Sequence, residues 1–516
     1  MKHITSYIIW VIVGIGALFV SCSDQLDQTN PNNTTDQTFW QSESDFSQAL
    51  TACYSPLKNG LDGGYYGTRG IMLRISRSDE VDFRNDISEI YQTYNFTNST
   101  GNSLVQGMFY QFYNALYRIN TVMQKMDEKK DILSTDFVNK MKGECLFLRG
   151  FYLFQLGKEF KDAPLRLIAS QVTSTFPLKK SSQEEIWSQA LTDLQASVNF
   201  LPMKNDIGKP TKGAAYAVMG KIYLYENKFD EAIKVLEPLT KSPYTYELVK
   251  NYEWNFDDSH EGNAESIFEI PIDNVGGSNP WAYETLDAAQ TNTRPKEYAA
   301  PEVGGWYEAN PTDQMIKILT EEKDKDGNYD YRARVSVAWD YPGCTYYMKN
   351  FRDIFPQDKW NTKWILKYQN WNTQTSEPDP PLSCINERAI RYADVILQLA
   401  ECYLRSTTQK NLQKAVSYIN MIRFRANLND YSGPMNYDDI FSDLEHQRAI
   451  EFFVEGERFY DLRRWGLLDD RIKTCSGVRY KQLESGKVGE TNRYYYYPIP
   501  SKELETNNLC TPSTGW

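Results

Sequence analysis

The sequence predicts a mainly α-helical chain in which stacked helix pairs carry a large, irregular, loop-rich insertion with short strands. Apolar residues recur at helical spacing in several long stretches. Two of these stretches repeat one pattern of small and apolar residues, and a segment dense in glycine, proline, asparagine and tryptophan separates the two copies. Because long irregular loops in compact proteins usually carry function, we expect the ligand to bind to the insertion.

Composition excludes several classes of partner. The chain has 516 residues, of which 41% are hydrophobic, and a formal net charge of −12 at pH 7. A hydrophobic fraction of this size supports a large core. The negative charge argues against nucleic acid as a partner and against electrostatic adhesion to anionic lipid.

The N-terminus has the features of an export signal. An apolar run from Ile8 to Val20 follows Lys2 and is too short to span a bilayer comfortably. The sequence Leu18–Cys22 resembles a bacterial lipobox, which predicts that Cys22 is the lipidated first residue of the mature protein. The alternative is an ordinary secretory signal that is cleaved nearby.

These features divide the chain into three parts. Residues 1–21 are predicted to be a lipoprotein signal peptide, and the polar residues 22–36 a flexible tether. Residues 37–516 would form the folded domain, in which no other stretch is long and apolar enough for a transmembrane helix. The protein would therefore be held at the membrane by lipid alone.

Helical spacing of apolar residues recurs along the first half of the folded part. The predicted helices are Thr38–Leu57, Met108–Met126, Phe137–Phe160 and Gln183–Phe200. Residues 71–101 are polar and aromatic without a clear period, so no element is predicted there.

A repeat follows these helices. Its first copy consists of Tyr216, Met219, Gly220, Tyr223, Ala232 and Leu236, which have the spacing of the tetratricopeptide pattern. A looser second copy consists of Leu399, Ala400, Tyr403, Ala415 and Ile419. A further pair would join Leu148–Phe160 to the helix around Ala190. The small residues let two antiparallel helices approach closely, which predicts a tetratricopeptide-like α-α superhelix at residues 105–242 and 387–428.

The insertion, residues 243–386, has the composition of a ligand-binding segment. Short strands are predicted at Ile267–Ile270 and Trp364–Tyr368. An aromatic ring packs on the apolar face of a sugar, while amide, carboxylate or guanidinium groups bond its hydroxyls. Two loops have this composition, and their candidate ligand-binding residues are Tyr65, Tyr66 and Arg69 in one, and Trp281, Tyr283, Trp306 and Tyr307 in the other. For each aromatic residue, a place in the core is an equal alternative.

Catalysis and cofactor binding lack sequence support. After signal removal only His260 and His446 remain, and no zinc-protease, phosphate-loop or dinucleotide motif occurs. The acidic stretch Asp324–Asp330 lacks the glycine and glutamate positions of an EF-hand, which favours a polar turn. The chain is therefore predicted to have no catalytic residue, no metal and no cofactor.

The stretch Glu445–Gly466 combines an apolar face with charges of both signs three residues apart, as in Arg448 to Glu451 and Asp461 to Arg464. This pattern predicts a charged amphipathic helix, and Gly456 within it suggests that another segment approaches closely. The stretch also resembles the C-terminal signature of the SusD/RagB family of outer-membrane nutrient-binding lipoproteins. Residues 148–165 and the tail 497–516 resemble the same family.

This resemblance implies a function that residue chemistry alone does not. Such a protein would sit on the cell surface as the lid of a SusC-like TonB-dependent transporter and would capture an oligosaccharide for nutrient uptake. The signature helix, Arg448 to Trp465, would have a structural role, and residues 437–516 would close the fold. The alternatives are a tetratricopeptide adaptor that binds protein, a peptide-binding relative, and a surface glycosidase.

Overall fold

The predicted fold class is confirmed by the computed structural model, which describes residues 39–58, 64–169, 176–273, 292–379, 381 and 383–516. These residues are mainly helical, and their strands are short and form six two-stranded antiparallel sheets. The helices before the insertion are α3 (Glu43–Tyr54), α4 (Thr68–Ser76), α5 (Ser88–Tyr94), α6 (Ser103–Glu128), α7 (Thr135–Phe160), α8 (Gln183–Ser197), α9 (Lys212–Tyr225) and α10 (Phe229–Leu236).

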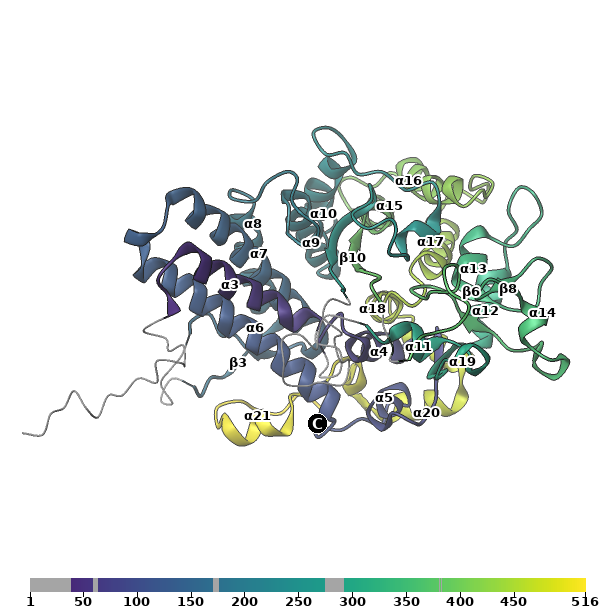
Figure 1. Cartoon of the computed structure of the whole chain (residues 1–516), viewed down its shortest axis with the longest axis horizontal. Coiled ribbons are helices and arrows are strands. Elements are labelled where there is room, and N and C mark those ends of the chain that lie inside the picture. Colours follow the sequence, from purple (N-terminus) through teal and green to yellow (C-terminus); the bar gives the residue numbers. More distant parts are fainter. Residues whose placement is uncertain (1–38, 59–63, 170–175, 274–291, 380, 382) are drawn as a thin grey trace, which may run out of the picture.

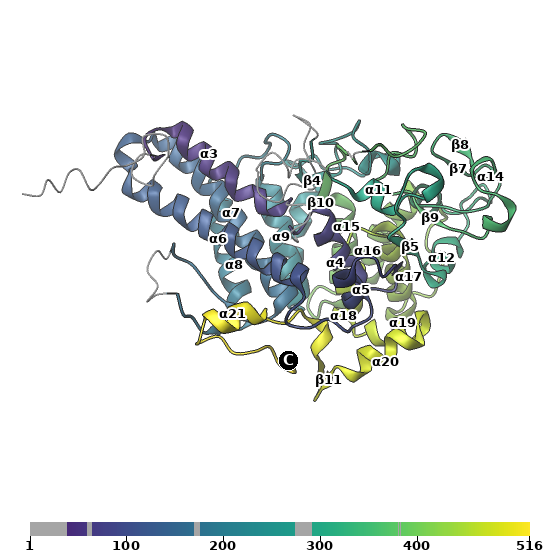
Figure 2. The same cartoon turned by 60° about the horizontal axis from the view of Figure 1, so that its bottom comes forward.

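The remaining helices belong to the insertion and to the part of the chain after it. Those of the insertion are short: α11 (Arg294–Tyr298), α12 (Asp313–Thr320), α13 (Tyr331–Ser336) and α14 (Phe351–Ile354). Those that follow are α15 (Tyr392–Arg405), α16 (Leu412–Arg425), α17 (Tyr437–Glu451), α18 (Arg458–Trp465), α19 (Leu468–Cys475), α20 (Gly477–Ser485) and α21 (Ser501–Thr506). Figures 1 and 2 show the long helices α3, α6, α7 and α8 at one end of the molecule and α12 and α14 at the other.

Close helix pairs form the scaffold, as the repeat predicts. α9 packs on α10, and α15 packs on α16. A Cβ atom added at Gly220 would lie 2.3 Å from Leu236 Cδ2, and one at Gly150 would lie 2.9 Å from the Ala190 carbonyl oxygen. Only glycine therefore permits the observed approach of α9 to α10 and of α7 to α8.

One small sheet pairs a strand of the insertion with the strand that directly follows the insertion. Strand β4 (Ser266–Ile270) pairs with β10 (Glu387–Arg391), with Ile270 opposite Glu387. The predicted strand at 267–270 is thus confirmed. The strand predicted at 364–368 ends after two residues, as β9 (Trp364–Ile365), and pairs with β6 (Val337–Ala338).

Two helices lie where no element is predicted, because they are too short for a clear apolar period. α4 and α5 both fall within or beside residues 71–101. α4 is buried along nearly its whole length, including Arg74. A helix that is buried on all sides lacks the polar face by which an amphipathic helix is identified.

The prediction of one signature helix through residues 448–465 is wrong. α17 ends at Glu451, and α18 begins only at Arg458. Between them Val454 has φ of +55° and Gly456 has φ of +77°. A Cβ atom at Gly456 would lie 2.8 Å from Arg74 Nε, so the predicted close approach of another segment is confirmed.

The backbone carbonyl groups that this break frees accept hydrogen bonds from buried lysine and arginine side chains. Lys367 Nζ donates to the carbonyl oxygens of Glu451 and Phe453 at 2.9 and 3.1 Å. Arg74 Nη2 donates to the carbonyl oxygen of Glu455 at 2.7 Å, and Arg294 donates to that of Val454. A continuous helix would keep these carbonyls within its own hydrogen bonds, which is the physical reason for the break.

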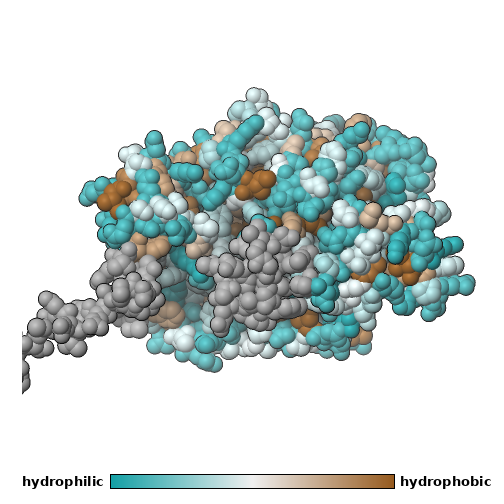
Figure 3. Space-filling model, viewed as in Figure 1, coloured by the Kyte–Doolittle hydropathy of each residue, from teal (hydrophilic) through white to brown (hydrophobic). Residues whose placement is uncertain are grey.

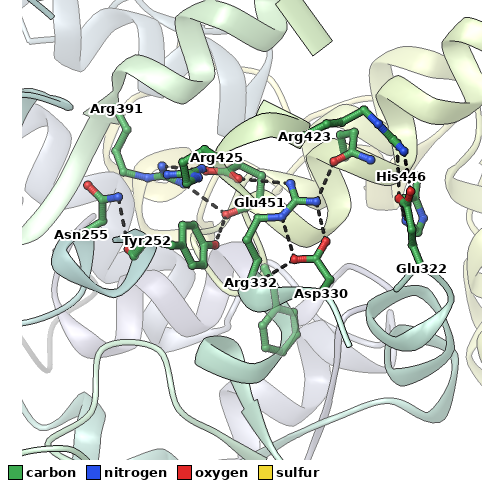
Figure 4. Close-up of polar contacts among 12 residues, drawn as sticks. Tyr252, Asn255, Glu322, Asp330, Arg332, Arg391, Arg423, Arg425, His446 and Glu451 are labelled. Atoms are coloured by element: carbon green, nitrogen blue, oxygen red, sulfur yellow. Dashed lines mark hydrogen bonds and ion pairs between the residues drawn. The ribbon is translucent and has the colours of Figure 1, made fainter. Parts of the chain in front are cut away.

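At the end of α17 lies a buried group of charges, which we call the Glu451 cluster: Asp330, Arg332, Arg391, Arg425 and Glu451. The Glu451 carboxylate pairs with all three arginines (Figure 4). Arg332 also pairs with Asp330 at 2.7 Å. Of the pairs predicted within this stretch, Asp461 and Arg464 do pair along α18, at 2.8 Å. Arg448 and Glu451 instead pair with residues of other elements.

The outer surface is mainly hydrophilic on the face shown in Figure 3, where hydrophobic residues are scattered. Among the residues that the structure describes, no helix is long and apolar enough to cross a membrane. Within those ranges no two cysteines form a disulfide bond.

The Glu451 cluster gives a direct stability prediction. Glu451→Gln removes one negative charge and leaves three buried arginines short of a partner, so the free energy of unfolding should fall by about 3–5 kcal/mol. Urea unfolding followed by circular dichroism measures this loss. Asp340→Asn is the matched control, because Asp340 pairs with Arg352, whose side chain is 60% exposed. An equal effect of the two substitutions would contradict the structural role of the cluster.

Glu80 gives a pH prediction. It is fully buried beside the Val454 backbone N–H, and burial raises its pKa from 4.5 to about 8. Between about pH 4.5 and 8 the folded state keeps a proton that the unfolded state releases, so this carboxyl lowers the stability of the fold as pH rises. Glu80→Gln should therefore gain stability relative to the original chain from pH 5 to 8. The exposed Glu484→Gln serves as control, and parallel curves for Glu80→Gln and the original chain would refute the assignment.

Candidate ligand-binding site

A two-stranded sheet joins the N-terminal part of the chain to the insertion. β1 (Val81–Phe83) pairs with β5 (Ala309–Pro311), with Val81 opposite Pro311. The Arg84 backbone N–H continues this ladder to the Glu308 carbonyl oxygen at 3.0 Å. The pairing therefore places the residues after β1 beside those before β5, where two predicted ligand-binding residues lie.

Those two residues, Trp306 and Tyr307, stand on a tightly held loop. A Cβ atom at Gly305 would lie 1.9 Å from the Ala299 carbonyl oxygen, which requires glycine there. The Tyr307 backbone N–H donates to the same oxygen at 3.1 Å. Tyr307 has φ of +46°, which is uncommon for a bulky side chain and costs on the order of 1–3 kcal/mol. Both aromatic side chains are half-buried, and Tyr307 packs against a hydrophobic cluster of the insertion, where its ring meets that of Trp364 edge-on at 6.3 Å.

Arg84, which directly follows β1, contacts this loop through its guanidinium group. Its guanidinium carbon lies 3.8 Å from the centre of the Tyr307 ring, and its Nη1 donates to the Trp306 carbonyl oxygen at 2.7 Å. It also pairs with Asp86. The guanidinium is one-third exposed and stays at the surface beside the two aromatic side chains, where it has donors to offer a ligand.

Two acidic side chains lie behind the loop. Arg69 in α4 pairs with Glu297 in α11 at 3.0 Å, and these two short helices lie side by side in Figure 1. Burial raises the pKa of Glu297, and burial followed by the charge of Glu297 raises the pKa of Glu308 to about 7. Among the residues with described positions, Oε2 of each glutamate accepts no hydrogen bond.

The loop and the residues around it have the chemistry of a binding platform. Trp306 supplies flat apolar surface, and Arg84, which stacks on one face of the Tyr307 ring, supplies donors. Glu308 is buried behind them, and burial raises its pKa to about 7. The charges of Arg84 and Arg69 are already balanced by Asp86 and Glu297. A neutral ligand rich in hydroxyl groups suits this balance better than an anion does.

The structure separates the other predicted residues from this platform. Tyr65 and Tyr66 are 1% and 4% exposed, and the guanidinium carbon of Arg74 lies 4.7 and 4.9 Å from their ring centres. The Tyr65 hydroxyl donates to Glu159 at 2.8 Å. Both rings thus occupy the core, the alternative that the sequence analysis kept open, and leave no face for a ligand.

Arg69 lies between the core and the platform. Its side chain is 12% exposed and pairs with Glu297, so it supports the site from behind. Trp281, Tyr283 and the predicted lipidation site Cys22 lie outside the described residues. The sequence analysis missed Arg84, Glu297 and Glu308, because nothing in their local pattern shows that β1 pairs with β5.

Two further predictions of the sequence analysis concern polar residues far from the platform. In the stretch 324–330, Asp324 Oδ1 accepts backbone N–H groups from Asp326 and Asn328 at 3.0 and 2.8 Å, which is the polar turn expected there. Within the ranges that the structure describes, no group of three or more His, Cys, Asp or Glu residues is arranged to hold a metal ion.

Comparison with known proteins places this architecture in a family. A family model described as SusD family matches residues 264–516, and a model described as starch-binding associating with outer membrane matches residues 24–224. A SusD superfamily protein from Bacteroides vulgatus with a known crystal structure is 65% identical, and the match covers 93% of this chain and 100% of that one with a TM-score of 0.87.

More distant matches also cover nearly the whole chain. SusD-like protein P25 from Formosa agariphila is 24% identical over 98% of each chain. Surface glycan-binding protein A from Bacteroides thetaiotaomicron, solved in complex with laminarihexaose, is 19% identical, with a TM-score of 0.70 over 91% of this chain and 98% of that one. The tetratricopeptide-like scaffold, the two family models and the high identity to the Bacteroides vulgatus protein lead to one conclusion: this chain belongs to the SusD family.

Proposed function

We propose that this chain is a cell-surface lipoprotein that captures an oligosaccharide and serves as the lid of a SusC-like TonB-dependent transporter. In this proposal it binds its ligand without altering it. The single observation that carries the ligand class is the platform of Trp306, Tyr307 and Arg84 at the β1–β5 junction.

The platform supports a sugar because the two components of sugar recognition meet there. The half-buried ring of Trp306 offers apolar area to the C–H face of a pyranose ring, and Tyr307, one face of which is covered by Arg84, lies next to it. The Arg84 side chain, one-third exposed, donates to hydroxyl groups. A loop pinned through Gly305 loses little conformational freedom on binding, which favours affinity.

The membrane role has separate support. The family model described as associating with outer membrane begins at residue 24, two positions after Cys22. Cys22 would carry the lipid, and the polar residues 22–36 would let the folded part move relative to the membrane. The barrel transporter as partner rests on family membership. Laminarihexaose is one of the test ligands because the structure of the Bacteroides thetaiotaomicron protein was solved in complex with it.

Affinity electrophoresis of a soluble form that begins at residue 23 tests the ligand class. Laminarin and a panel of plant, host and microbial polysaccharides are cast into native gels. One polysaccharide should retard the chain, and Trp306→Ala should weaken this affinity about tenfold or more, as expected for loss of a central aromatic contact.

Trp254→Ala is the matched control, because Trp254 is also a half-buried insertion tryptophan, with its ring stacked on His260 at 4.5 Å. It should leave retardation unchanged. Retardation that survives Trp306→Ala would refute the platform, and failure of every polysaccharide would refute glycan capture. Release of shorter sugars from the retarding polysaccharide would favour a glycosidase instead.

A further inference from the structure

We propose a second saccharide-binding site, a groove between residues 240–251 and the exposed face of α16. The ligand class rests on the proposed function, but the groove is built from elements other than β1, β5 and α11. It belongs to the scaffold side of the insertion, where the chain leaves α10 and passes over the second repeat copy.

The groove has the size of a ligand site. Its volume is about 1060 Å³, and residues 244–246 also line a smaller cavity of about 300 Å³. Sites for small ligands are clefts of about 300–1,000 Å³. The described part of the Trp306 platform borders neither cavity.

Two tyrosines form one wall. In the segment 243–248 exposed residues alternate with half-buried ones, so Tyr244 and Tyr246 point to the same side. Their rings are nearly parallel, at 14°, with centres 6.1 Å apart. Tyr392 at the start of α15 is 4% exposed and packs beside Tyr246, with ring centres 6.2 Å apart. The two half-buried rings offer apolar surface to a sugar.

The opposite wall is a face of α16 that exposes large apolar side chains. Ser417, Met421 and Phe424 follow one another at the spacing of one side of α16. Phe424 is 73% exposed and Met421 is 38% exposed. Phe424 stands at the mouth of the groove, where a bound sugar would cover its ring and recover hydrophobic free energy.

The groove offers hydrogen-bonding groups that suit hydroxyl groups. Amides and hydroxyls such as Asn251, Asn420 and Thr245 line its walls, and they both donate and accept, as sugar hydroxyls do. Charges of both signs lie beside them: Lys241, Lys250 and Glu247 also line the groove, and Arg425 is paired with Glu265 at 3.2 Å and with Glu451.

Hydroxyl-radical footprinting of the soluble chain locates binding at each site separately. The probes are laminarihexaose, cellohexaose, maltohexaose and xylohexaose, each at millimolar concentration, with peptide mapping by mass spectrometry. One of them should protect Met421 and Phe424 from oxidation. Met435, which is 44% exposed and does not line the groove, is the internal control and should stay fully reactive.

Variants separate this proposal from the proposed function. Phe424→Asp, at an exposed position that does not endanger folding, should abolish protection of Met421 and leave protection of Trp306 unchanged. Tyr117→Asp on α6, 45% exposed, is the matched control. Tyr244→Ala should act in the same way as Phe424→Asp.

The outcomes distinguish the two sites. Protection of Trp306 without protection of Met421 by any hexaose would overturn the groove and leave the platform standing. Protection of Met421 alone would support the groove and contradict the platform. No protection at either place by the four hexaoses would overturn both assignments, and protection of Met421 by an unrelated peptide alone would overturn the saccharide assignment of the groove.

Discussion

The structure depends on a set of buried charges that meet where the signature segment breaks. Burial opposes the charge of Glu451, but Arg425, Arg391 and Arg332 outweigh this effect and hold its pKa well below the ordinary range. Desolvating so many charges is costly, and a single missing partner leaves an uncompensated ion. Such a cluster accepts only one arrangement of its elements, because any other arrangement would bury a charge alone.

This constraint explains how a loop-rich insertion keeps a defined position. Arg332 and Lys367 come from the insertion, Arg391 and Arg425 from the scaffold, and Glu451 from the signature segment. The insertion has little regular structure of its own, so ion pairs and carbonyl contacts replace the packing that long helices would provide. The break at Val454 and Gly456 supplies the carbonyl groups for this purpose.

Buried ion pairs and hydrogen bonds to backbone carbonyl groups also hold the ligand platform in place. Arg294 in α11 joins Glu387 at 2.8 Å and the Val454 carbonyl oxygen, which ties α11 to the centre of the molecule. Glu297 in the same helix holds Arg69, and the chain then turns directly into the Trp306 loop. The platform is therefore carried by buried charge contacts rather than by the loop alone, which would pre-form it for the ligand that we propose.

Local pattern allowed the scaffold to be predicted, but not the site. Gly220 and Ala232 at fixed spacing identify a helix pair because close packing imposes that spacing within one short segment. The burial of Tyr65 and Tyr66 depends on Arg74 and Glu159, which lie on other helices, so composition could not separate core rings from ligand-facing rings. Arg84 and Glu308 meet through the pairing of two strands that lie far apart in the sequence, one before the scaffold helices and one in the insertion, which a single sequence does not reveal. The break at Val454 likewise follows from tertiary contacts that override helical periodicity.

A crystal structure of the chain with a bound oligosaccharide tests the central claim most directly. The oligosaccharide would be taken from whichever polysaccharide retards the chain. Our account predicts a sugar ring against Trp306, with Arg84 within hydrogen-bonding distance of a hydroxyl group and the β1–β5 junction unchanged. A ligand bound at neither the Trp306 platform nor the groove beside α16, or a platform that must unfold to admit it, would contradict the account.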